Sequence, residues 1–183
     1  IWNKGADGQW NSEDIRGHDG SVECLQALPD GRIVSGGRDK QIRIWIKGAD
    51  GTWSSEVLSE DAGNVYCLQC LPDGRIVSGS SNGIQIWNKG ADDKWSSDAL
   101  SKNGEDELCL QVLLDGRIVS GSYQNPIRIW TKGADCQWSS EVLRGHTHAV
   151  TCLQVHPDGR IFSGSHDCII RIWDGEEIGG GQS

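Results

Sequence analysis

The chain has 183 residues, with 26 Asp and Glu against 17 Lys and Arg, and its net charge is −9 at pH 7. Binding to nucleic acids or to anionic membranes needs concentrated Lys and Arg, so this balance predicts neither kind of partner. No apolar run approaches the roughly 20 residues that span a bilayer, and because the chain has no methionine we expect a piece of a longer or processed protein.

A period near 43 residues runs through the whole chain. Ile-Trp recurs at 1–2, 44–45, 86–87, 129–130 and 172–173, and Asp-Gly-Arg-Ile recurs at 30–33, 73–76, 115–118 and 158–161. A unit copied in this way buries its apolar faces only against its neighbours, so the period predicts a ring or stack of repeats.

The first complete unit is predicted to hold four short antiparallel strands. They are expected at 22–28, 32–36, 41–45 and 53–58, with turns at 29–31, 37–40 and 47–51. The first strand has the pattern of a strand that is buried on both faces, and the third alternates strictly between apolar and polar residues. Four such strands in about 40–45 residues are typical of a β-propeller blade, so we predict an all-β fold.

The motifs of the first and fourth units resemble the WD40 repeat. The first has Gly17-His18, Ser35-Gly36, Asp39 and Trp45, and the fourth has Gly145-His146, Ser163-Gly164-Ser165, Asp167 and Trp173. The resemblance implies a β-propeller of four-stranded antiparallel blades, four per chain. It also implies a buried hydrogen-bonded chain from Trp to Ser to His to Asp, formed by His18, Ser35, Asp39 and Trp45 in one blade and by His146, Ser163, Asp167 and Trp173 in the other.

The two middle units depart from this pattern. Asp61 and Asn103 stand where His is expected, and the connections that begin at Ser81 and Tyr123 lack the Asp. We therefore predict that the middle blades lack the full network.

The four blades are expected to occupy residues 1–175, with repeats at about 17–58, 59–100, 101–143 and 144–175 and a flexible tail at 176–183. The last repeat has no outer strand after it, while 10–16 reads as an outer strand with no inner strands before it. WD40 rings normally hold seven or eight blades, so we expect a homodimer of eight blades in which each 10–16 strand closes the last blade of the other copy. A strained four-bladed monomer is the alternative.

Four of the seven cysteines, Cys24, Cys67, Cys109 and Cys152, occupy the same place in successive units. Such positions lie too far apart for the roughly 4.4–6.8 Å between Cα atoms that a disulfide needs. We interpret them as small buried side chains of a reduced protein and expect a cytoplasmic location.

Little in the sequence suggests chemistry. His148, His166 and Cys168 lie on two connections that meet on one blade in the WD40 family, which makes them a candidate zinc site. Because the neighbouring His146 is needed for the network and no other unit repeats the cluster, we predict no metal and no cofactor. No phosphate-binding loop or nucleophile motif is present, and we predict that the chain is not an enzyme.

Comparison of the units with one another indicates a binding face. The Asp-Gly-Arg-Ile and Lys-Gly-Ala-Asp turns hardly vary, whereas the connections before the first strand and between the second and third strands vary freely. The resemblance implies a scaffold that binds a protein or peptide there, and the candidate contact residues are Glu23, Arg38, Tyr66, Tyr123 and His166. Two alternatives stay open: a metal- or glycan-binding propeller, and a self-assembling or engineered fragment with no partner but itself.

Overall fold

The structure is a computed structural model that describes residues 1–101, 106–124 and 126–174. These residues form strands, turns and loops, and none of them lies in a helix long and apolar enough to cross a membrane. The tail predicted at 176–183 and the side chain of Asn103 lie outside the described residues.

Short strands follow one another along the chain. An N-terminal hairpin consists of β1 (Trp2–Lys4) and β2 (Trp10–Ser12). The first blade holds β3 (Val22–Ala27), β4 (Ile33–Gly37), β5 (Ile42–Lys47) and β6 (Trp53–Ser59), and the second holds β7 (Val65–Cys70), β8 (Ile76–Ser80), β9 (Gly83–Lys89) and β10 (Trp95–Ala99). The third holds β11 (Glu107–Val112), β12 (Ile118–Ser122), β13 (Ile127–Lys132) and β14 (Trp138–Leu143), and the last holds β15 (Val150–Val155), β16 (Ile161–Ser165) and β17 (Ile170–Trp173).

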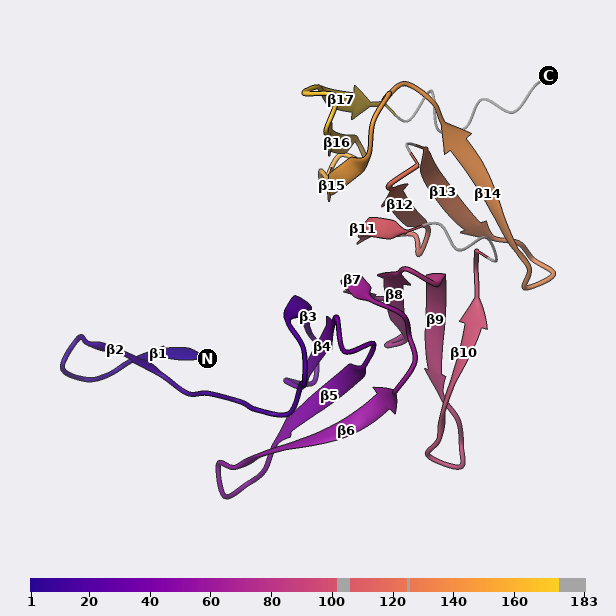
Figure 1. Cartoon of the computed structure of the whole chain (residues 1–183). Coiled ribbons are helices and arrows are strands. Elements are labelled where there is room, and N and C mark those ends of the chain that lie inside the picture. The colour runs from indigo at the N-terminus through magenta and orange to yellow at the C-terminus, as the bar shows by residue number, and fades with distance from the viewer. Residues whose placement is uncertain (102–105, 125, 175–183) are drawn as a thin grey trace.

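Each blade is an antiparallel sheet in which strands pair in chain order. Figure 1 shows the blades as an open arc, with the inner strands β3, β7, β11 and β15 in a row and the N-terminal hairpin projecting beyond the first blade. The predicted all-β propeller fold with four blades is confirmed. The last sheet has three strands in this chain, and β2 pairs with β1, so completion of that sheet by residues 10–16 of another copy stays a prediction.

The two turns that hardly vary are held by their own side chains. Asp30 accepts hydrogen bonds from the backbone N–H and the guanidinium of Arg32, at 3.1 and 2.8 Å, and the same pairing recurs in the other three blades. In the hairpin between β5 and β6, the N–H of Gly48 donates to the carbonyl of Thr52, and Gly51 has a φ of 83°. Glycine adopts that φ without the strain that a side chain adds.

Side chains of neighbouring blades form the core together. Val34, Ile42 and Ile44 of the first blade pack with Leu68 and Ile76 of the second, and all five are buried. Corresponding clusters lie between the second and third blades and between the third and the last. The hydrophobic stabilisation of each blade therefore depends on having a neighbour on both sides.

The two end blades each leave one face open. On the first blade Leu25 is 67% exposed, whereas Leu68, its equivalent on β7, is 3% exposed. On the last blade Ile170 is 78% exposed, whereas Ile42, its equivalent on β5, is fully buried. The prediction that the strand at 22–28 is buried on both faces is therefore wrong for the single chain, because no described blade packs on its outer face.

Candidate interaction face and its supporting network

A continuous hydrogen-bonded chain crosses the first blade. Trp45 Nε1 donates to Ser35 Oγ at 2.7 Å, Ser35 Oγ lies 2.6 Å from His18 Nε2, and His18 Nδ1 lies 2.7 Å from Asp39 Oδ2. Since a carboxylate can only accept, the proton sits on Nδ1, and Nε2 accepts from the Ser35 hydroxyl. This order satisfies every member of the chain and joins the loop before β3 to the loop between β4 and β5.

The last blade repeats this arrangement around His146. Its ring nitrogens lie 2.8 Å from Asp167 and 2.8 Å from Ser163, and Trp173 Nε1 donates to Ser163 Oγ at 2.8 Å. The side chains of His146 and Asp167 are 1% and 4% exposed.

Hydrogen bonding also sets the charge state of this carboxylate. Burial by itself raises the pKa of Asp167, but the bonds from His146 and from the backbone N–H groups of Thr147 and Ile169 outweigh burial and lower it to about 2. The pKa of Asp39 is lowered in the same way, by His18 and two backbone N–H groups acting against burial. Both carboxylates are therefore ionised near neutral pH.

Both middle blades keep the inner half of the network, and in the second blade the described residues show no outer half. Trp87 donates to Ser78 at 2.8 Å and Trp130 donates to Ser120 at 3.0 Å, in the same buried geometry as in the end blades. Asp61, which stands at the His position of the second blade, is exposed. In that blade the Ser81 hydroxyl accepts a hydrogen bond from the backbone N–H of Asn64 at 2.9 Å. This direct bond joins the two loops that a His–Asp pair joins in the end blades.

The first strand of every blade contains a β-bulge that sequence reasoning missed. The pairing register shifts at Glu23, Tyr66, Leu108 and Thr151. A bulge bends the strand and redirects a side chain, and it occurs here at the two candidate residues Glu23 and Tyr66. The sequence carries one weak signal of the bulge. The residue before it is Val or Glu and the residue after it is Cys in every unit, whereas the bulged residue itself differs from unit to unit.

Four equivalent positions in the loop after the second strand have fixed backbones and different side chains. They are Arg38, Ser81, Tyr123 and His166, and each donates its backbone N–H at 2.9–3.0 Å to a carbonyl of the loop before the first strand. The side chains of Arg38, Tyr123 and His166 are exposed. Arg38 Nε donates to Glu23 Oε1 at 2.8 Å, and the bonds from Ser21 and Arg38 lower the pKa of Glu23.

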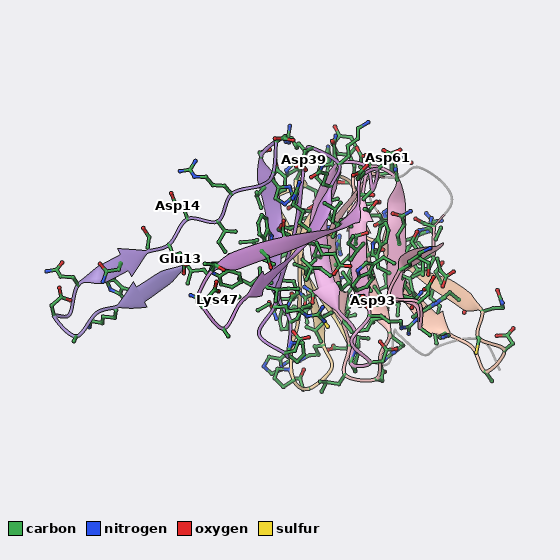
Figure 2. All side chains as sticks on the ribbon, turned by 90° about the horizontal axis from the view of Figure 1, so that it is seen from below. Glu13, Asp14, Asp39, Lys47, Asp61 and Asp93 are labelled. Carbon is green, nitrogen blue, oxygen red and sulfur yellow. The ribbon has the colours of Figure 1, made fainter. Side chains whose placement is uncertain are left out.

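These positions lie on one face of the molecule. Figure 2 shows Asp39 and Asp61, from the two variable kinds of connection, at one end of the blades, and Lys47 and Asp93, from the hairpins that hardly vary, at the opposite end. We call the end that carries the loops at 18–21, 38–41, 60–64, 81–82, 123–124, 147–149 and 166–168 the variable face.

The candidate zinc cluster is not assembled. His148, His166 and Cys168 are all exposed, and across residues 1–101, 106–124 and 126–174 no group of three or more His, Cys, Asp or Glu is placed to hold a metal. All seven cysteines are free thiols, and burial raises the pKa of Cys24 and of Cys109 to about 12. Thiols with a pKa raised this far are unreactive near neutral pH. Cys109 is buried and Cys24 and Cys67 are partly buried, but Cys152 is exposed. The prediction of four buried cysteines is therefore wrong at Cys152, because the other three thiols lie against a carbonyl of the next blade and no described blade covers that face of the last sheet.

Antiparallel four-stranded sheets that pack side by side around a row of inner strands define a β-propeller. Within this class, the hydrogen-bonded chain from Trp to Ser to His to Asp points to the WD40 repeat. The family model of the WD domain, G-beta repeat, matches residues 11–45, 54–88 and 137–174, and the chain belongs to this WD40 family. The resemblance expected from the motifs is confirmed. A comparison with curated proteins finds no match.

Proposed function

We propose that this chain is a non-catalytic WD40 scaffold that binds a protein or peptide on the variable face. The observation that carries the proposal is the set of positions 38, 81, 123 and 166, where a fixed backbone presents four different side chains. A rigid scaffold with varied exposed side chains is the usual basis of recognition, and Arg and Tyr are the residue types that contribute most to binding energy. WD40 repeats support such a role in general.

A peptide display library tests this proposal directly. Peptides selected on the wild-type chain should lose about tenfold in affinity, or roughly 1.4 kcal/mol, on the Arg38→Glu or Tyr123→Ala variant. Lys94→Glu makes the same change of charge as Arg38→Glu but lies in the β9–β10 hairpin at the opposite end, so it should leave affinity unchanged. Selected peptides whose affinity responds to Lys94→Glu and not to Arg38→Glu would contradict the proposed face.

We further propose that two copies form an eight-bladed ring, in which each supplies the neighbour that the other's end blades lack. The exposed Leu25 and Ile170 support this, because their equivalents inside the arc are buried. Light scattering should give a mass near twice 19.9 kDa. A monomer at micromolar concentration would contradict the assembly, and a dimer from which no peptide is selected would favour a chain that binds only itself.

We do not expect nucleic acids or membranes among the partners, because the net charge of −9 repels their phosphate groups.

A further inference from the structure

The N-terminal segment lies where the outer strand of a preceding blade belongs. Between the first and second blades, Glu56 of β6 accepts from Trp95 Nε1 at 3.1 Å and lies 3.5 Å from Lys89 Nζ. Glu13 makes the matching contact with Lys47 of the first blade at 3.0 Å, as Figure 2 shows. Residue 13 is thus held against the first blade as residue 56 is held against the second.

An apolar groove separates this segment from the first blade. It has a volume of about 480 Å³, and its lining includes Ile1, Ile15, Val22, Leu25, Ile33 and Trp45. On the second blade, the equivalent residues Val65, Leu68, Ile76 and Trp87 are covered by side chains of the first blade. The groove is therefore the space in which the inner strands of a preceding blade would lie.

The last blade carries the face that fits this space. Its Phe162, Ile170 and Ile172 stand at the positions of Val34, Ile42 and Ile44, which cover the second blade. Ile170 is 78% exposed and Ile172 is 53% exposed, and the outer edge of β17 has no strand beside it in the described chain. The occupant that matches the groove in both side chains and strand order is β15–β17 of a second copy.

The pairing register of the complete blades assigns the contacts. Arg43 lies opposite Val57 in the first blade, and Arg128 lies opposite Val142 in the third. The same register places Ile170 opposite Ile15, Arg171 opposite Asp14 and Trp173 opposite Ser12 of another copy. Only at this junction does an acidic residue face the arginine.

Among the described residues, Arg171 has no acidic partner, and Asp14 has only a neighbour in sequence. Arg171 Nε is buried and has no hydrogen-bond partner among the described residues, whereas Arg43 Nε donates to Gln41 at 2.8 Å, and Ile169 replaces that glutamine in the last blade. The Asp14 side chain is 73% exposed and meets only the nearby Arg16, at 3.2 Å. We propose, on the basis of the eight-bladed homodimer above, that the groove is the docking site for the last blade of a second copy and that Asp14 and Arg171 form the ion pair that sets its register.

Docking in this register displaces the start of the chain. Trp2 lies opposite Ser12 in the N-terminal hairpin, and the carbonyl of Ile1 accepts from the N–H of Glu13 at 2.8 Å. Ile172 and Trp173 of the second copy need the same edge of the strand. The dimer therefore forms by exchange of one strand for another.

Charge reversal tests the ion pair. Asp14→Arg places two arginines at each junction of the dimer and Arg171→Asp places two aspartates there, so each variant alone should dimerise at least about tenfold more weakly than the wild type. A one-to-one mixture of the two variants has opposite charges at both junctions and should recover the dimer as a heterodimer. Sedimentation velocity gives the dissociation constants, and native mass spectrometry identifies the heterodimer.

Two further variants complete the design. Glu60→Arg reverses a charge in an exposed loop away from both junctions and should dimerise as the wild type does. If Arg171→Asp does not fold, as judged by circular dichroism, Arg171→Gln replaces it. Asp14→Arg should then pair with Arg171→Gln in preference to itself, because that heterodimer keeps one Asp14–Arg171 pair and has no junction with two arginines. A wild-type dimer that tolerates Asp14→Arg, or variants that do not recover on mixing, would overturn the register while leaving the homodimer intact. A monomeric wild type would overturn both proposals.

Discussion

Replacement of His146 with alanine removes the centre of the network in the last blade. The Asp167 carboxylate, which is 4% exposed, loses the bond from Nδ1 and keeps two bonds from backbone N–H groups. The Ser163 hydroxyl loses the acceptor for its proton and keeps the bond from Trp173. Leaving a buried polar group unsatisfied costs about 1–3 kcal/mol, and because both groups keep part of their bonding we expect a loss within that range rather than twice it.

Urea denaturation followed by tryptophan fluorescence measures this loss at a fixed protein concentration. His18→Ala should lose a similar free energy of unfolding, since its ring bonds of 2.6 and 2.7 Å match those of His146. Asp61→Ala is the matched control, because this residue stands at the His position of the second blade but is exposed, and a change within about 0.5 kcal/mol is expected. Asn103→Ala should likewise cost clearly less than either histidine variant. Equal losses at all the sites would refute the inference that the middle blades lack the network.

Three other predictions concern acid stability, blade packing and assembly. The pKa of Asp167 is about 2 in the folded chain and 3.8 ordinarily, so its contribution to stability is complete above about pH 4 and is lost as the pH falls toward 2. The difference in free energy of unfolding between the wild type and Asp167→Asn should therefore shrink over that interval, as denaturation curves at several pH values would measure. A Cβ at Gly121 would lie 2.7 Å from Val150 Cγ1 of the next blade. Gly121→Ala should therefore lower the free energy of unfolding by about 1–3 kcal/mol. A loss below about 0.5 kcal/mol would show that the blades pack less closely. Deletion of residues 1–16 removes the strand proposed to close the ring, so the truncated chain should be monomeric or aggregate in light scattering, and an unchanged dimer would contradict that role.

The strands of the fold could be predicted because each is bounded by a turn with strong local preferences. In the first unit, Pro29-Asp30-Gly31 marks the end of one strand and the Asp30–Arg32 pairing holds the turn, and the predicted strand at 53–58 matches β6 at Trp53–Ser59. The side chains that the WD40 motif selects at His18 and His146 lie in hydrogen-bonded chains, since the spacing of the motif reflects those contacts.

Other features could not be predicted, because they depend on residues far apart in the chain. The bulge at Glu23 and Tyr66 leaves no mark in an alternating pattern, since one extra residue in a six-residue strand is indistinguishable from a shift of register. The contact of Glu56 with Lys89 joins two neighbouring blades, so it does not follow from the pattern of either strand alone. One sequence signal could have indicated it, because Glu, Lys and Trp recur at matching places in the units. Exposure of Leu25 depends on the absence of a neighbour, which no local pattern encodes.

The full network occurs in the two blades that have only one neighbour in the chain. An array of repeats opens most readily at its ends, because a terminal unit gains interface energy from one side only. The bonds of His18 and His146 join loops within the terminal blades themselves, so they oppose local opening where the interfaces do least. Amide protons of β3 and β15 should consequently exchange with solvent more slowly than their position at the ends of the array implies, and the single chain should resist fraying at both ends.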